Sequence, residues 1–315
     1  MQCKAQSHDS IFGIAWNSVL ALMLVLLVLI GVVLFIVFAA QPAQAQTFKV
    51  LHTFTGGADG ASPFGTFTMD QAGNIYGAPW GGGRGNGTVF RLWKKGSNWL
   101  FNPLYAFLGS DGSTPWSAAI MGSDGNLYGA THGGGPSDAG VVYSLKPAGA
   151  CETALCPWTE TVLYSFTGGN DGANPGYGHF IFDQAGNMFG ETLWGGAYGA
   201  GTVFELVPSQ GGWTESVLHS FNFSDGYLPA TGLVFDKVGN LYGTTLLGGA
   251  YGQGTVFQLT PSGSGWTENV LYSFQGGSDG AHPYPGVVFD PSGNLYGGTD
   301  SGGAYGWGVV WEITR

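Results

Sequence analysis

The stretch "DQAGNMFGETLWGGAYGAGTVFEL", Asp183–Leu206, decides the fold because the chain repeats it. It returns as "DKVGNLYGTTLLGGAYGQGTVFQL" at Asp236–Leu259 and as "DPSGNLYGGTDSGGAYGWGVVWEI" at Asp290–Ile313. Self-similarity at a fixed period is typical of solenoids, propellers and other arrays. The Gly-Asn pair of the motif occurs five times, 52 to 61 residues apart, at Asn74, Asn126, Asn187, Asn240 and Asn294.

The composition favours a β protein and excludes some partners. The 315 residues include 58 Gly, 15% are aromatic and only 9% are charged, which suits short strands joined by tight turns. The net charge of −11 comes from 20 acidic and 9 basic residues. Nucleic acids and anionic membrane surfaces would require a Lys/Arg patch, so neither is expected as a partner.

Each repeat contains four strand-like runs. In the fourth copy they are Thr231–Asp236, Asn240–Thr245, Gly254–Leu259 and Trp266–Phe274, separated by Gly/Pro/Asp-rich turns. Val, Phe, Tyr and Thr between such turns indicate strands, and no stretch after Gln46 has helical periodicity. Four antiparallel strands in about 50 residues is the size of one propeller blade.

The two ends of the repeat region favour a closed ring. Thr47–Phe54 matches the fourth strand of the repeat, whereas Gly308–Arg315 matches the third. If the two paired, the exposed edge of the last blade would be covered. A linear solenoid would instead need atypical capping repeats. We therefore predict an all-β fold: a five-bladed β-propeller of four-stranded antiparallel blades, closed by the N-terminal strand of the mature chain.

Residues 1–46 form a separate targeting segment before the repeat domain at 47–315. Lys4 precedes a long apolar run, Ser18–Ala40, which predicts an apolar helix. The Ala43–Gln44–Ala45 triplet fits a signal-peptidase site, so the segment is a signal peptide removed before Gln46. The run is also long enough to be retained as a transmembrane anchor. Under either alternative the repeat domain is exported, that is, secreted, periplasmic or displayed on a bacterial cell surface.

Two cysteines lie in an insertion that the other repeats lack. Cys151 and Cys156 occur in "AGACETALCPWTE", where the other copies have a short turn. In an oxidising compartment they are expected to form a disulfide that closes the inserted loop. A metal site would need further Cys or His residues nearby, so none is predicted there.

The combination "GNLYG…GGAYGxGTVF…WTExVLYSF…DG" resembles the GloVer (Gloeobacter–Verrucomicrobia) repeat of bacterial exported "choice-of-anchor" proteins. The resemblance covers residues 47–315. It implies a secreted or surface-displayed tandem-repeat protein. It supplies no catalytic residues, because the family has no established activity.

Two recurring aspartates have turn-like surroundings. The first opens segments such as "DQAGN", in which Asp accepts backbone N–H groups and Gly supplies a positive φ. The second precedes Gly and lies four residues before a Pro. An Asx turn explains this second aspartate. Alternatively, five such carboxylates around the propeller axis attract a polyol or a cation. Ca²⁺ is the cation to test, and no other cofactor is expected. This second set is Asp59, Asp111, Asp171, Asp225 and Asp279.

The candidate ligand-binding residues lie where the copies differ. In a propeller, the loops between blades and those between second and third strands open on one face. Aromatic side chains beside Gly-rich backbone suit stacking on sugar rings, although they could equally pack between blades, as we expect of Trp158, Trp213 and Trp266. The candidates flank the Gly-Gly pair: Trp80, His132, Trp194, Tyr198, Tyr251 and Tyr305.

The preferred function is a non-enzymatic, monomeric module that binds an extracellular glycan or protein. A glycoside-active enzyme is the alternative, and it would need two carboxylates in unlike environments. Glu191 and Asp300, which break the repeat, are the candidates. His179 stands where other copies have small residues and is either a structural histidine or a ligand. A purely structural surface protein is the third hypothesis. No nucleophile elbow, zinc motif or Walker-type loop is present.

Overall fold

The computed structural model describes residues 22–27, 29, 47–117, 119–147, 158–229, 231–263 and 265–314. The chain divides into two compact units, Met1–Leu51 and His52–Arg315, and the repeats lie in the second. Residues 22–27 and 29 of the first unit are helical. In the described part of the chain, no helix is both long and apolar enough to cross a bilayer. The rest of the Ser18–Ala40 run, the Ala43–Ala45 motif and the Cys151–Cys156 pair lie outside the described residues, so leader, anchor and disulfide stay predictions.

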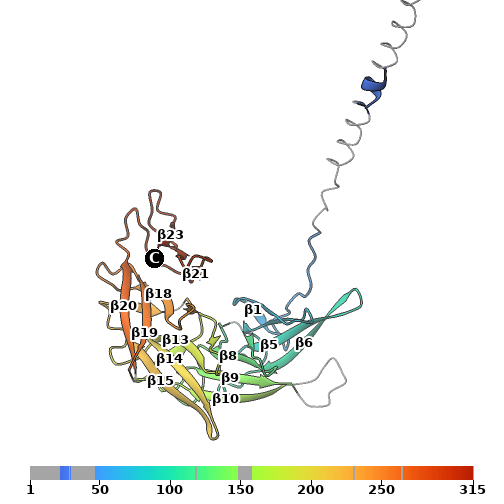
Figure 1. Cartoon of the computed structure of the whole chain (residues 1–315). Coiled ribbons are helices and arrows are strands. Elements are labelled where there is room, and N and C mark those ends of the chain that lie inside the picture. The colour runs from blue at the N-terminus through green and yellow to red at the C-terminus, as the bar shows by residue number, and fades with distance from the viewer. Residues whose placement is uncertain are drawn as a thin grey trace, which may run out of the picture. The chain divides into compact units, whose positions relative to one another are not determined.

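The repeat unit is all-β. Each repeat forms one main antiparallel sheet, and we number these main sheets 1 to 5 along the chain (Figure 1). Sheet 1 has the order β2-β3-β5-β6, comprising β2 (Thr68–Met69), β3 (Ile75–Gly77), β5 (Thr88–Lys95) and β6 (Asn98–Ala106). Beside it, β1 (Ala61–Pro63) pairs with β4 (Pro79–Gly81). Sheet 2 comprises β7 (Ile120–Met121), β8 (Leu127–Thr131), β9 (Val141–Lys146) and β10 (Thr159–Ser165).

Sheets 3 and 4 each add a short fifth strand. Sheet 3 comprises β11 (Ala173–Pro175), β12 (Ile181–Phe182), β13 (Met188–Trp194), β14 (Thr202–Ser209) and β15 (Gly212–Ser220). Sheet 4 comprises β16 (Tyr227–Pro229), β17 (Val234–Phe235), β18 (Leu241–Leu247), β19 (Thr255–Ser262) and β20 (Gly265–Ser273). Sheet 5 has three strands: β21 (Val288–Phe289), β22 (Leu295–Gly298) and β23 (Val310–Ile313).

The recurring Asp-x-x-Gly-Asn segment forms the turn between the first two strands of a sheet. In sheet 4, Asp236 accepts hydrogen bonds from the backbone and side-chain nitrogens of Asn240 at 2.9 and 2.8 Å and from the Tyr242 hydroxyl at 3.1 Å. Gly239 has a φ of +94°, which a residue with a side chain rarely adopts. The motif is therefore explained by turn chemistry, as the sequence indicates.

The core lies between consecutive sheets. Four clusters of buried apolar side chains each join one sheet to the next. At each interface an aromatic residue after the outer strand packs on the third strand of the following sheet, as Phe166 does on Phe204 at 5.2 Å and Phe221 on Phe257 at 5.1 Å. Burying one such side chain stabilises the fold by roughly 2–3 kcal/mol. Outer-strand tryptophans pack back on the preceding sheet, which confirms the expectation for Trp158, Trp213 and Trp266.

The predicted strand pairing between the chain ends is not present. Residues 47–54 form no strand, and β23 is the outermost strand of sheet 5. Only His52–Phe54 of that stretch belongs to the repeat unit, because Thr47–Leu51 groups with the N-terminal unit. Phe54 nevertheless packs on Phe90 of β5, with ring centroids 5.4 Å apart. It makes the contact with sheet 1 that Phe166 and Phe221 make with sheets 3 and 4.

Candidate functional site

A strained turn at the start of each repeat sets up the candidate site. The residue before each recurring proline has a left-handed backbone, with φ between 50° and 58°. These residues are Ser62, Thr114, Asn174, Leu228 and His282. Such backbone costs a non-glycine residue roughly 1–2 kcal/mol and persists only where surrounding contacts impose it. One such contact is the hydrogen bond from the Asn174 backbone N–H to the Ala139 carbonyl at 2.8 Å in the preceding repeat.

Four aromatic side chains from three repeats gather beyond these turns. Trp116 lies over His132 with centroids 4.0 Å apart, and Tyr177 of the next repeat lies 4.8 Å from Trp116. Tyr177 also contacts Tyr284 of the fifth repeat edge-on, at 6.5 Å. We call Trp116, His132, Tyr177 and Tyr284 the aromatic cluster. Tyr284 is 42% exposed and Trp116 and Tyr177 are partly buried, so part of the cluster reaches solvent.

The imidazole of the cluster is neutral at physiological pH. Burial lowers the pKa of His132 to about 4, against the opposing effect of Asp138. Its Nδ1 atom is buried and has no hydrogen-bond partner. His132 therefore acts here as a flat, uncharged ring with one free nitrogen. Such a group can contact an uncharged ligand without an ionic partner.

A buried carboxyl group lies in sheet 3. Glu191 on β13 stands where the other repeats have Ala78, Ala130, Thr244 and Gly298. Its Oε2 accepts a 2.8 Å hydrogen bond from the Gly232 N–H of sheet 4, whereas its buried Oε1 has no partner. Burial raises the pKa of Glu191 to about 7, against the backbone hydrogen bonds that lower it. Near neutral pH this carboxyl group can therefore give up or take a proton.

His179 lies on the same part of sheet 3 as Glu191. Ile181 pairs with Phe189 in the β12–β13 register, and continuing that register by two residues places His179 opposite Glu191. A Cβ atom built on Gly232 would lie 3.3 Å from Nδ1 of His179, so the imidazole also adjoins the glycine that Glu191 binds. The His179 side chain is exposed. The histidine that the sequence singles out is thus an exposed residue that adjoins the same glycine as the buried acid.

The second candidate acid, Asp300, has a different environment. Its carboxylate is half-exposed and lies 3.4 Å from Nδ1 of His282, which is also 3.1 Å from the Ser301 hydroxyl. Burial, and to a smaller extent the charge of Asp300, raises the pKa of Tyr284. Asp300 therefore borders the aromatic cluster as a solvated acid, whereas Glu191 is a buried one.

The structure separates the aromatic residues that the sequence groups together. Of the six candidates, His132 belongs to the aromatic cluster. Trp194 packs instead on Tyr227, 5.4 Å away, and Tyr227 contacts Phe223. Trp80 is an exposed residue of β4. Tyr198, Tyr251 and Tyr305 lie at the tips of the Gly-rich loops as exposed side chains.

The five loop aspartates serve their own turns. Each accepts a backbone N–H from a residue three or four positions before it, as Asp171 does from Thr167 at 2.7 Å. Each also lies against the Tyr or His that precedes it, as in the 3.1 Å hydrogen bond from the Tyr164 hydroxyl to Asp171. The Thr55 hydroxyl contributes most to lowering the pKa of Asp59, to about 2. This is the Asx-turn role; cation or polyol binding by Asp59, Asp111, Asp171, Asp225 and Asp279 stays a prediction.

Sequence analysis missed three members of the aromatic cluster. Trp116 and Tyr284 directly follow the recurring proline, and Tyr177 follows it after one extra glycine. The position after this proline varies among the repeats, with Phe64 in the first and Ala230 in the fourth. That variation, beside a constant proline, was the available signal.

Comparison with known proteins places the sequence in a family. The family model described as the Gloeobacter/Verrucomicrobia repeat matches residues 36–178 and 155–315. No curated protein matches the sequence.

Several solved structures are distantly similar to this one. A protein of Thermus thermophilus assigned as an oxidoreductase (glucose dehydrogenase) is 18% identical, with 80% of this chain and 86% of that chain covered and a TM-score of 0.45. The endo-arabinase of Bacteroides thetaiotaomicron VPI-5482 is 15% identical over 81% and 94% of the two chains, with a TM-score of 0.39. A protein of unknown function from Dyadobacter fermentans DSM 18053 is 14% identical over 74% and 73%, with a TM-score of 0.42.

The identification rests on the repeats themselves. The two matched ranges together run from residue 36 to residue 315 and include all five sheets. This chain belongs to the Gloeobacter/Verrucomicrobia repeat family.

Proposed function

We propose that the chain is an exported β-propeller whose aromatic cluster binds an extracellular glycan. The observation that carries the proposal is the convergence of Trp116, Tyr177 and Tyr284 from three repeats onto one partly exposed site. Aromatic faces stack on the apolar faces of sugar rings, and polar tips beside them bond to hydroxyl groups. The hydroxyl groups of Tyr177 and Tyr284 and the half-exposed Asp300 supply such tips.

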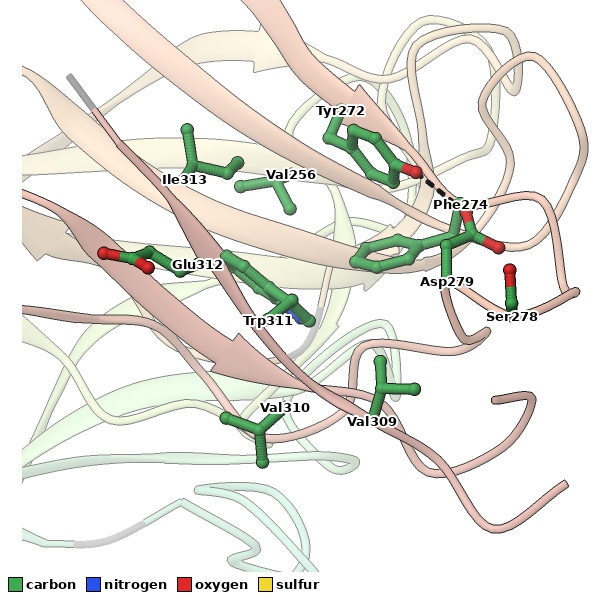
Figure 2. A pocket seen from close by; sticks show the side chains of 10 residues that line it. All are labelled: Val256, Tyr272, Phe274, Ser278, Asp279, Val309, Val310, Trp311, Glu312 and Ile313. Atoms are coloured by element: carbon green, nitrogen blue, oxygen red, sulfur yellow. Dashed lines mark hydrogen bonds between the residues drawn. The ribbon is translucent and has the colours of Figure 1, made fainter. Parts of the chain in front are cut away.

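The proposed propeller has five blades and closes through Thr47–Phe54. A groove of about 380 Å³ lies along β23, between it and β20 (Figure 2). Phe274 and Trp311 form its floor, and Tyr272 donates a hydrogen bond to Asp279 at its rim. Both β23 and Thr47–Phe54 carry exposed apolar side chains: Val310 on β23 is 86% exposed, and Phe48 is 93% exposed. Pairing the two segments would bury both.

The repeat register defines the proposed pairing residue by residue. In sheet 4, Leu259 pairs with Glu268 and Gln258 with Asn269. The same register would place Phe48 opposite Ile313 and Lys49 opposite Glu312. Phe48 would then enter the groove, as Glu268 enters the interface between sheets 3 and 4. The opposite charges of Lys49 and Glu312 support this register, because cross-strand pairs of unlike charge are favourable.

Glycan binding can be tested on purified repeat domain with a panel of bacterial and plant polysaccharides. Trp116→Ala should weaken binding about tenfold, because a stacked ring contributes about 1.4 kcal/mol. Tyr305→Ala is the matched control, since that exposed ring lies on a loop tip outside the cluster. If no glycan binds the wild-type protein, the glycan proposal fails, and a protein ligand becomes the alternative to test.

Glycoside hydrolysis is a second candidate function because Glu191 and Asp300 have unlike environments. A buried carboxyl with a raised pKa suits a general acid, and a solvated carboxylate suits a base or nucleophile. Release of reducing ends by the wild-type chain, and its loss in Glu191→Gln, would support hydrolysis. Inertness of the wild-type protein on every polysaccharide that it binds would leave only the binding function.

A further inference from the structure

A group of three potential metal ligands lies at the interface of sheets 3 and 4, away from the aromatic cluster. His219 is on β15, Asp225 is in the following loop and Glu268 is on β20 of the next sheet. One nitrogen or oxygen atom from each of these side chains lies within 4.8 Å of the other two. We call His219, Asp225 and Glu268 the interface triad.

Two atoms of the interface triad lack hydrogen bonds although they are buried. The Nε2 atom of His219 and the Oε1 atom of Glu268 are both shielded from solvent without a hydrogen-bond partner. Nε2 lies 3.2 Å from Oδ2 of Asp225, whose carboxylate is held in place by the backbone and side-chain nitrogens of Asn222 at 2.9 and 2.8 Å. The unpartnered Oε1 atom of Glu268, the imidazole Nε2 atom of His219 and the oriented carboxylate of Asp225 together form a set of donors that a cation would satisfy.

The equivalent interfaces show what is special about this one. Between sheets 1 and 2, Tyr105 donates a 2.5 Å hydrogen bond to Asp111, and between sheets 2 and 3, Tyr164 donates one to Asp171. Glu160 and Glu215 occupy the Glu268 position there. A tyrosine hydroxyl satisfies the aspartate, whereas an imidazole at the same position adds a nitrogen ligand. Among the described residues, only the interface triad brings three such ligands together.

The first repeat provides a natural contrast. His52 lies 3.1 Å from Asp59, as His219 lies near Asp225. The residue facing it from the outer strand, however, is Phe101, and the imidazole stacks on that ring at 3.9 Å. Histidine therefore accompanies a glutamate in one interface and a phenyl ring in the other. The aspartate–histidine pair alone does not complete a ligand set.

From this arrangement we infer that the interface triad binds one divalent transition-metal cation of the zinc class. One imidazole nitrogen and two carboxylate oxygens are a ligand set that Zn²⁺ accepts, with water in the remaining position. His219 and Asp225 retain 19% and 13% side-chain exposure, which leaves a path for the ion. The bound cation would join β15 to β20 and stabilise the contact between sheets 3 and 4. The inference is independent of glycan binding.

The test measures zinc binding to the full repeat domain after its cysteines have been alkylated, so that thiolates cannot contribute. Titration calorimetry and native mass spectrometry should show one Zn²⁺ per chain and a rise in Tm of about 5 °C at saturation. His219→Tyr carries the residue of the equivalent interfaces, so it should keep the metal-free Tm and lose the bound zinc. Glu268→Gln should weaken binding at least tenfold without changing the shape of the side chain. Equal zinc binding by the wild-type protein and both variants would overturn the inference.

A gain-of-site variant tests the same geometry in the opposite direction. Tyr164→His places an imidazole beside Asp171 and Glu215, which have the arrangement of Asp225 and Glu268. This chain should bind a second equivalent of zinc. A folded Tyr164→His chain that still binds one equivalent would contradict the claim that the triad is sufficient.

Discussion

The third strands of sheets 4 and 5 occupy the same position in the repeat but have different surroundings. Val256 on β19 is 0% exposed, whereas its counterpart Val310 on β23 is 86% exposed. In sheet 4 the outer strand β20 pairs along β19, and three of its own residues, Trp266, Glu268 and Val270, are half-buried. Sheet 5 ends at β23. Val256 is buried in a cluster with Val287 and Leu295 of the following repeat, whereas sheet 5 is the last sheet of the chain. The comparison shows that the third strand of a repeat is covered by the repeat that follows it.

The interface between sheets 3 and 4 is filled, whereas the edge of sheet 5 is open. Loss of an aromatic ring should therefore destabilise the chain more at this interface than at that edge. Phe221 is fully buried against Phe257. Phe221→Ala should therefore lower the free energy of unfolding by about 3 to 5 kcal/mol, measured by urea titration. Phe223→Ala, which removes an exposed ring two residues away, is the control and should change it by less than about 1 kcal/mol. Similar losses in both variants would mean that this interface is not the core.

The same interface should make stability depend on pH through Glu191. The pKa of its carboxyl is raised from 4.5 to about 7 in the folded chain, so folding favours the protonated form. That contribution is complete below pH 4.5 and is lost as pH rises to about 7, a change of about 3 kcal/mol. Glu191→Gln keeps an acceptor for Gly232 but does not titrate. In thermal melts, we expect the Tm of the variant to rise relative to that of wild type as pH increases from 4.5 to 8. A Tm difference that does not change with pH would contradict the assignment.

The stability of the open edge of sheet 5, at β23, should depend on Phe48, which belongs to the N-terminal unit. If Phe48 fills the groove along β23, Phe48→Asp should lower the free energy of unfolding by about 1 to 3 kcal/mol, because an apolar contact is replaced by a charge beside Trp311. Val238→Asp, at an exposed turn position, is the matched control. Equal stability of the two variants, measured in the same denaturant series, would mean that Phe48 stays in solvent.

The Asp-x-x-Gly-Asn turn occurs in both sheet 4 and sheet 5, and substitutions in it should have the smallest effect on stability. Asp236 accepts hydrogen bonds from the Val238 and Asn240 backbone, the Asn240 side chain and the Tyr242 hydroxyl in sheet 4, and Asp290 has the same role in sheet 5. Asp236→Ala should cost about 1 to 2 kcal/mol, and Asp290→Ala should cost less because sheet 5 is less completely packed. Lys237→Ala provides the control for a neighbouring turn residue. A greater loss from Asp290→Ala in urea titrations would reverse this ranking.

Local chemistry explains which parts of the fold could be predicted from sequence. The Asp-x-x-Gly-Asn turn and the alternation around Val256 and Phe257 depend on neighbours within one repeat, so the sequence pattern defines the sheets. The outer-strand tryptophans recur at the same position, which made their packing between sheets predictable. Pairing of Thr47–Phe54 with β23 depends instead on contacts between the chain ends. Neither strand pattern nor period determines such a contact.

The candidate site was less predictable because it depends on convergence between repeats. His132 could be selected from its position beside Gly-Gly, but Trp194 at the same position packs on Tyr227 instead. Trp116, Tyr177 and Tyr284 come from three different repeats, so their contacts depend on how those repeats are arranged. The orphaned oxygen of Glu191 likewise becomes visible only once sheet 4 covers it.

Ring closure is tested most directly by a disulfide across the proposed strand pair. Lys49→Cys and Glu312→Cys would be combined in a chain whose three native cysteines are serine, and each single variant would serve as control. Closure predicts a disulfide within the monomer after mild oxidation, seen by mass spectrometry, and a higher Tm that reduction reverses. Failure of the monomer to form this bond, or its formation only between chains, would contradict a propeller closed by its own N-terminal strand.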